Sequence, residues 1–191
     1  MTVEIGRPRD PRIDSAVLDA TVELLAETGY ASLSVDAIAR RAGTSKPAIY
    51  RRWPSKAHLV HEAVLPISAA TELPDTGTVL GDVREMMRRT IDVLTTPPAR
   101  AALPGLVGET AADPTLHAAL LERFAHVLSR GLTDWLESAL ARGEVRPEVN
   151  AADVVDAIAG ITFVALITHG DTMDDAWSER TAELITRGIT A

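Results

Sequence analysis

The chain contains no cysteine and few aromatic residues. Without cysteine it cannot form disulfide bonds, thiolate metal sites or a cysteine nucleophile. Phe, Trp and Tyr together make up 4% of the 191 residues, whereas sheets are built from aromatic and β-branched runs. The abundance of Ala and Leu therefore favours helices. Hydrophobic residues (46%) outnumber charged ones (24%), which indicates a folded chain with a real core.

Long hydrophobic runs are also missing. No apolar segment typical of a secretion signal follows Met1. The most apolar stretch, residues 154–167, contains an acidic residue and is shorter than the roughly 20 residues that span a bilayer. We therefore expect a cytoplasmic protein with no membrane partner.

The net charge of −8 is distributed unevenly. Residues 1–60 carry nine basic and seven acidic groups, whereas residues 61–191 carry ten basic and twenty acidic groups. Within the first part, residues 37–58 contain six Arg or Lys and no acid. This asymmetry indicates a cationic head that could bind nucleic acid on an acidic body, although a merely solvated basic face is the alternative.

Hydrophobic spacing, caps and breakers predict an all-α fold of about nine helices. We expect an N-terminal three-helix DNA-binding helix-turn-helix domain over residues 1–60, with a flexible basic arm. A helical ligand-binding and dimerisation domain would follow over residues 61–191. The predicted helices cover residues 12–28, 35–41, 46–53, 56–65, 79–94, 100–111, 114–142, 151–169 and 175–187.

Two of the short helices, 35–41 and 46–53, are separated by a tight turn, and the second is basic. This arrangement is typical of a helix-turn-helix, in which Gly43 supplies the backbone freedom of the turn. Ile38 and Ile49 would pack the pair onto the first helix. Outward-pointing Arg and Lys side chains could then reach guanine in the major groove, with phosphate contacts on either side. The residues expected to face DNA are Lys46, Tyr50, Arg51, Arg52 and Lys56.

Residues 33–60 read LSVDAIARRAGTSKPAIYRRWPSKAHLV. This segment resembles the DNA-binding signature of the TetR family of one-component regulators, with its Ile-Ala…Ala-Gly turn, serine cap, Ile-Tyr pair and aromatic followed by Ser-Lys. The resemblance covers about residues 12–65, roughly a third of the chain. It implies phosphate contacts by Ser34, Tyr50 and Lys56 and a base contact by Lys46. It also places Thr44 and Ser45 near the DNA backbone.

Two departures from the family pattern affect the expected readout. Pro47 stands where many members have Gly, so a backbone N–H donor is lost there. Arg51 and Arg52 stand where many members have an aromatic residue or His. We therefore expect a readout that prefers guanine.

Helix 151–169 is apolar nearly all round, so it must be buried on more than one side. It could be a central helix of one domain, but the family resemblance implies that the last two helices form a homodimer interface. The candidate interface residues are Val154, Ile158, Ile161, Ala165 and Trp177. Candidates for lining an effector pocket, whose spacing fits plain core equally well, are Met86, Met87, Phe124, Trp135 and Phe163.

Other signals carry less weight. Gly6-Arg7-Pro8-Arg9 resembles a minor-groove AT-hook, although a solvated tail is the favoured interpretation. The spacing of His58 and His61 is not that of a zinc-protease motif. No catalytic or phosphate-binding motif is present, so we expect no metal, no cofactor and no enzyme activity.

The sequence thus predicts a homodimeric transcriptional repressor that a small-molecule effector of unknown identity releases from a palindromic double-stranded DNA operator. The effector would act by shifting the helix around residues 54–65. One alternative is a DNA-binding protein without an inducer that acts through protein partners. Another is a helical enzyme or metal-binding protein that merely carries a basic patch.

Overall fold

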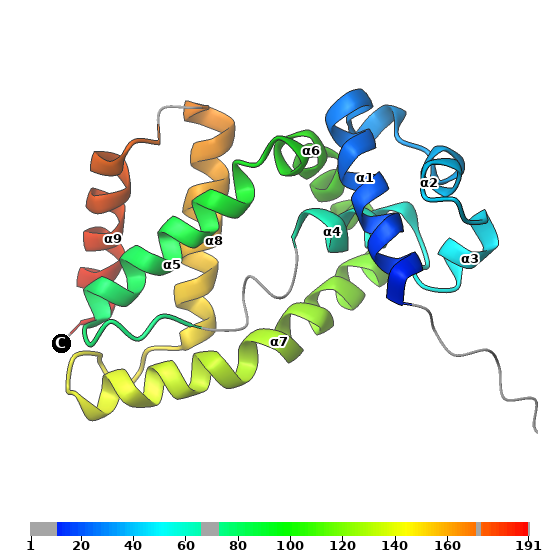
Figure 1. Ribbon diagram of the computed structural model, residues 1–191. Helices are drawn as coiled ribbons and strands as arrows, with labels where there is room; N and C mark the ends of the chain where they lie inside the picture. Colours follow the sequence, from blue (N-terminus) through cyan, green and yellow to red (C-terminus); the bar gives the residue numbers. More distant parts are fainter. Residues whose placement is uncertain (1–10, 66–72, 171–172, 191) are drawn as a thin grey trace, which may run out of the picture.

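A computed structural model describes residues 11–65, 73–170 and 173–190, without the side chains of residues 121, 123–130 and 169. The described residues form nine α-helices and no strand beyond one isolated bridge between Val145 and Thr190, which confirms the all-α prediction (Figure 1). The helices are α1 (Pro11–Ser32), α2 (Val35–Arg41), α3 (Lys46–Tyr50), α4 (Lys56–Val64), α5 (Val79–Leu94), α6 (Pro97–Ala112), α7 (Pro114–Ala141), α8 (Ala151–His169) and α9 (Asp175–Ile189).

Three serines start the short helices of the N-terminal region. The side-chain oxygens of Ser34, Ser45 and Ser55 each accept a hydrogen bond from the backbone N–H three residues later, at 3.2 to 3.3 Å. Such caps satisfy backbone donors that have no partner within the helix. The predicted starts of α2, α3 and α4 are therefore confirmed.

Three predicted boundaries differ from the structure by three or more residues. Helix α1 continues past Gly29 to Ser32 rather than ending at residue 28. Helix α3 ends at Tyr50 rather than residue 53. Helix α6 starts at Pro97, with Thr96 as its cap, rather than at residue 100. In the first turn of a helix the backbone N–H groups have no acceptor within the helix, so proline, which lacks this N–H, is tolerated there. The two prolines therefore begin α6 instead of separating it from α5.

The end of α1 bends at Gly29. This glycine has φ 71°, a left-handed conformation that other residues adopt only with strain. Beyond the bend, the Tyr30 side chain is buried among hydrophobic residues of the first core. The bend thus brings an aromatic ring from α1 into contact with the helices that cover it.

The hydrophobic residues form two cores. The first lies among α1, α2, α3, α4 and α6 and includes Leu116 and Leu120 from the start of α7. The second lies among α5, α8, α9 and the end of α7, around Val83, Met87 and Trp135. In Figure 1 these two groups form opposite ends of the molecule, and α7 runs along both.

Several helices contribute to both cores. Helix α5 places Val83 in the second core and Leu94 in the first, and Phe163 of α8 packs against the first core. The predicted domain boundary at residue 60 falls inside α4, which packs against both α1 and α6. The N-terminal helices and the body thus share one hydrophobic core.

The contact between α1 and α6 is especially close at one point. A Cβ atom added to Gly105 of α6 would overlap the ring of Tyr30. A glycine is therefore required at this position for α6 to lie against the ring. Gly108, one turn further along α6, has open space at the corresponding position.

This pair of glycines gives a matched test. We expect Gly105→Ala to destabilise the protein by about 1–3 kcal/mol, because the extra methyl group forces α6 away from Tyr30. Gly108→Ala should be neutral or stabilising by up to about 1 kcal/mol, since alanine is the better helix former. Urea unfolding of both variants measures the difference. Equal stability of the two would contradict the close α1–α6 contact.

Candidate nucleic-acid interface

The α2–α3 pair has the geometry of a helix-turn-helix. Gly43 adopts φ 64° in the turn, and the Thr44 N–H donates to the Ala39 carbonyl at 2.9 Å. Ile38 and Ile49 are almost completely buried in the first core, as predicted. Packing on this side leaves the opposite side of α3 open to solvent.

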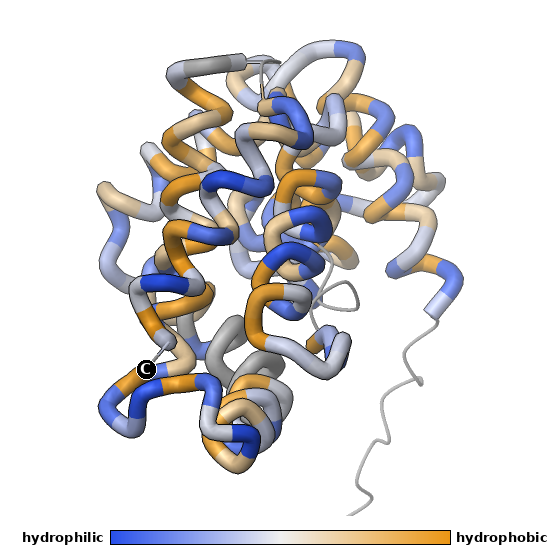
Figure 2. The backbone as a smooth tube through the Cα atoms, turned by 90° about the vertical axis from the view of Figure 1, so that its left-hand side faces the viewer, coloured by the Kyte–Doolittle hydropathy of each residue, from blue (hydrophilic) through white to orange (hydrophobic). Residues whose placement is uncertain are grey.

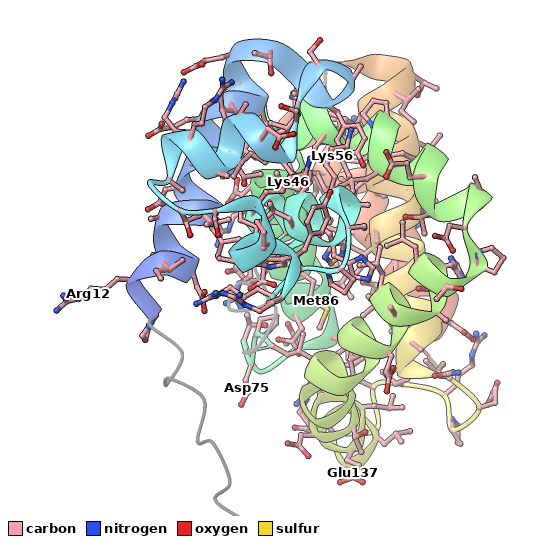
Figure 3. All side chains as sticks on the ribbon, turned by 90° about the vertical axis from the view of Figure 1, so that its right-hand side faces the viewer. Arg12, Lys46, Lys56, Asp75, Met86 and Glu137 are labelled. Carbon is pink, nitrogen blue, oxygen red and sulfur yellow. The ribbon has the colours of Figure 1, made fainter. Side chains whose placement is uncertain are left out.

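The exposed side of α3 carries Lys46 and Tyr50, and the exposed Arg51 follows directly as its C-cap. Tyr50 is 44% exposed, and Arg51 makes no ion pair with any residue that the structure describes. Lys46 bonds to Asp36 of α2 at 2.7 Å, and this carboxylate raises the pKa of the lysine. Figure 3 looks onto this side of the molecule and labels Lys46. These side chains can meet the edge of a DNA base or a phosphate.

The cap serines also keep a hydrogen-bond donor that faces solvent. Ser34 and Ser45 are exposed, and each uses its oxygen as an acceptor within the chain. The hydroxyl hydrogen of each remains a donor, which suits a phosphate oxygen. Thr44 is half-buried in the turn, whereas Pro47 is exposed in the first turn of α3.

Arg52 does not point outward as predicted. Its guanidinium pairs with Asp14 of α1 and donates to the Ala48 carbonyl at 3.2 Å. Only 14% of the side chain is exposed. Arg52 therefore holds the end of α3 against α1, and Arg51 is the exposed arginine of the predicted pair.

Lys56, at the start of α4, also has partners within the chain. Its Nζ donates to the Tyr30 carbonyl at 3.2 Å and lies 4.0 Å from the centre of the Tyr30 ring. The Glu109 carboxylate of α6 lies 3.8 Å from the same nitrogen. Burial raises the pKa of the Tyr30 hydroxyl, and the nearby Glu109 carboxylate adds to the shift.

Arg41 is a structural residue that the sequence analysis missed. Its guanidinium bonds to Glu23 and Glu27 of α1 at 2.9 to 3.0 Å, which holds α2 against α1. The hydrogen bond from Arg41 lowers the pKa of Glu27. The sequence does contain a pattern that indicates a partner for a basic residue: Glu23 and Glu27 are four residues apart and share one face of a helix.

The predicted pocket residues lie mostly in the second core. Met86, Met87 and Trp135 are buried there, and the Trp135 indole donates to buried Asp82 at 3.0 Å. Phe163 is partly buried against the first core. The side chain of Phe124 lies outside the described residues.

The predicted interface residues face inward. Val154, Ile158 and Ala165 are buried within the chain, and Ile161 and Trp177 pack against the second core. Different apolar residues of the last two helices are exposed. These are Val164 (57%), Ile167 (65%) and Leu184 (66%).

Two further predictions concern the arm and the histidines. The arm residues Gly6 to Arg9 lie outside the described residues. The Nδ1 atom of His58 lies 2.9 Å from the Ser55 hydroxyl, and His61 is buried. Across the described ranges, no group of three or more His, Cys, Asp or Glu side chains could hold a metal ion.

Comparison with known proteins agrees with this geometry. Residues 17–63 match the family model described as bacterial regulatory proteins, tetR family, and residues 73–185 match the tetracyclin repressor-like C-terminal domain. The chain belongs to the TetR family. It is therefore a helix-turn-helix, DNA-binding transcriptional regulator and not an enzyme.

Individual relatives agree over nearly the whole chain. The uncharacterized HTH-type transcriptional regulator YdeS of Bacillus subtilis is 31% identical, covering 90% of this chain and 87% of its own. A DNA-binding transcriptional repressor TetR of Mycobacteroides abscessus is 32% identical, with 87% of both chains covered. The structure of a TetR transcriptional regulator from Agrobacterium tumefaciens shares the fold, with a TM-score of 0.65 and 21% identity over 96% of each chain.

Arg51 and Arg52 should separate DNA contact from stability. We expect Arg51→Ala to weaken DNA binding while changing the free energy of unfolding by less than about 0.5 kcal/mol, because Arg51 is exposed. Arg52→Ala should lower that free energy by about 1 kcal/mol, since Asp14 loses its partner. Urea unfolding and DNA titration of both variants measure the two effects. An Arg52→Ala protein as stable as the wild type would contradict the assigned role.

Proposed function

We propose that the protein is a homodimeric repressor that binds a palindromic operator and releases it when a small molecule binds the body. The observation that carries the proposal is the exposed side of α3, which presents Lys46 and Tyr50, with Arg51 exposed directly after the helix. An α-helix fits the major groove, where Arg and Lys can pair with guanine. Residues 1–60 would provide the DNA-binding head and residues 61–191 the body.

Each residue of the head would have a distinct role. Lys46 and Arg51 would read base edges, with guanine preferred. Ser34, Ser45, Tyr50 and Lys56 would donate hydrogen bonds to phosphates, and Thr44 would lie near them in the turn. Such phosphate contacts orient the head, whereas the base contacts carry the sequence preference. Pro47, without an N–H, would limit direct backbone contact at the start of α3.

The apolar surface of α8 and α9 supports a dimer. Among the described helices, α8 alone is long and apolar enough to cross a membrane, yet only 28% of residues 151–168 are buried within the chain. Figure 2 looks onto the end of the molecule formed by α5, α8 and α9 and colours the hydrophobic residues orange along the backbone. Exposed Asp153 and Asp156 on α8 disfavour a bilayer, where charges are costly. A second copy of the chain would cover Val164, Ile167 and Leu184 instead.

A polar group inside the body supports an effector site. Thr162 of α8 is fully buried, and its hydroxyl has no hydrogen-bond partner among the residues that the structure describes. By contrast, the hydroxyls of Thr90, Thr168 and Thr181 donate to the carbonyl four residues earlier in their helices. An unpaired buried hydroxyl is costly, and an apolar effector with one polar group would satisfy it.

A repressor of this kind would bind its operator in the cytoplasm.

Selection of bound duplexes from random DNA tests the function. We expect an inverted repeat whose half-sites lie about one helical turn, or a multiple of it, apart. Repeating the selection at two salt concentrations separates base readout from phosphate contact, because phosphate contact alone weakens steeply with salt. Binding that yields no motif would contradict a sequence-specific repressor. The recovered duplex then serves as the probe for compounds that release the protein.

The dimer has its own test. We expect Ile167→Glu to sediment as a monomer at micromolar concentration, because burying the unpaired carboxylate costs about 3 kcal/mol or more. Val107→Glu is the matched control, since Val107 is 47% exposed but lies on α6. It should sediment like the wild type. An Ile167→Glu protein that remains dimeric would contradict the proposed interface.

A further inference from the structure

The ammonium of Lys56 lies at the meeting point of three helices. Lys56 starts α4, while Tyr30 at the end of α1 provides the carbonyl and ring that hold its Nζ. Glu109 of α6 lies 3.8 Å from the same nitrogen. About a quarter of the Lys56 side chain remains exposed to solvent.

An ammonium group has three hydrogens to donate. One is used by the Tyr30 carbonyl at 3.2 Å. The other two are available to anions, and Glu109 is the anion that the body supplies. A DNA phosphate at the same ammonium would meet a carboxylate of like charge, so the two anions would oppose each other.

The position of Glu109 is set by the body of the protein. Glu109 follows Gly105 by four residues on α6, and Gly105 lies against the Tyr30 ring. The Glu109 side chain is 45% exposed, and within the described residues its ion pair is with Lys56. The same carboxylate lies near the Tyr30 hydroxyl, and any movement of α6 changes its distance from Lys56.

We propose that Glu109 is an internal competitor for the ammonium that a DNA phosphate uses, so that the position of α6 sets the strength of the Lys56 phosphate contact. The proposal rests on the proposed function, in which Lys56 contacts the operator backbone. Glu109 is a positioning residue in this account, because it acts on DNA only through Lys56. Bringing α6 closer to α4 weakens the phosphate contact, and moving it away strengthens the contact.

A double-mutant cycle tests the inference. Operator affinity is measured by fluorescence anisotropy on the duplex recovered by selection, for the wild type, Glu109→Gln, Lys56→Met and the double variant. We expect Glu109→Gln to bind roughly two- to five-fold more tightly, the size of a partly exposed ion pair. In the Lys56→Met background the same change should have no effect. Methionine keeps an apolar stem to pack on the Tyr30 ring.

Glu137→Gln is the matched control. It removes one carboxylate from α7, far from Lys56 in Figure 3, and therefore measures the effect of net charge alone. The inference is overturned if Glu109→Gln tightens binding no more than Glu137→Gln does. It is also overturned if Glu109→Gln tightens binding equally without the lysine. The comparison between the two glutamine variants decides the question even if the Lys56→Met chain does not fold.

The outcomes also separate this inference from the function itself. A wild-type chain that selects no motif contradicts the proposed repressor, and the inference falls with it. A wild-type chain that selects an inverted repeat, combined with an inert Glu109→Gln change, leaves the repressor intact and removes only the role of Glu109.

Discussion

The packing of Tyr30 is the contact on which the arrangement of head and body depends. Its ring is buried at the bend of α1, with Lys56 of α4 on it and the backbone of α6 against it at Gly105. Because the contact needs a glycine, a larger residue at position 105 would push α6 away from the ring. The DNA-binding helices and the body consequently share a core, so a movement of α6 changes the surroundings of Tyr30 and Lys56.

Several basic side chains of the N-terminal helices hold these helices together. Arg41, Lys46, Arg52 and Lys56 all bond to groups within the chain. The exposed pairs contribute little stability individually, but they fix the orientation of α2, α3 and α4. A basic residue in this segment therefore does not necessarily contact DNA. Arg51, exposed and without an ion pair among the described residues, is the cation that best fits a base-reading role.

Most local signals in the sequence predicted the structure correctly, whereas partners distant in the sequence were not predicted. The serine caps and the turn at Gly43 depend on residues within a few positions, so the helix-turn-helix was predictable. Arg52 pairs with a residue 38 positions away, and Lys56 bonds to one 26 positions away. No spacing rule reveals such contacts. For the same reason the sequence identified α8 as unusually apolar but could not tell its inner face from its outer one.

Amide hydrogen exchange of the full chain, with and without its operator duplex, tests this coupling most directly. DNA should slow exchange in residues 34–56, which would contact it. The shared Tyr30 contact predicts that exchange also changes in residues 105–109 of α6, which lie outside the proposed DNA interface. A change confined to residues 34–56, with α6 unaffected, would contradict the view that head and body respond as one unit.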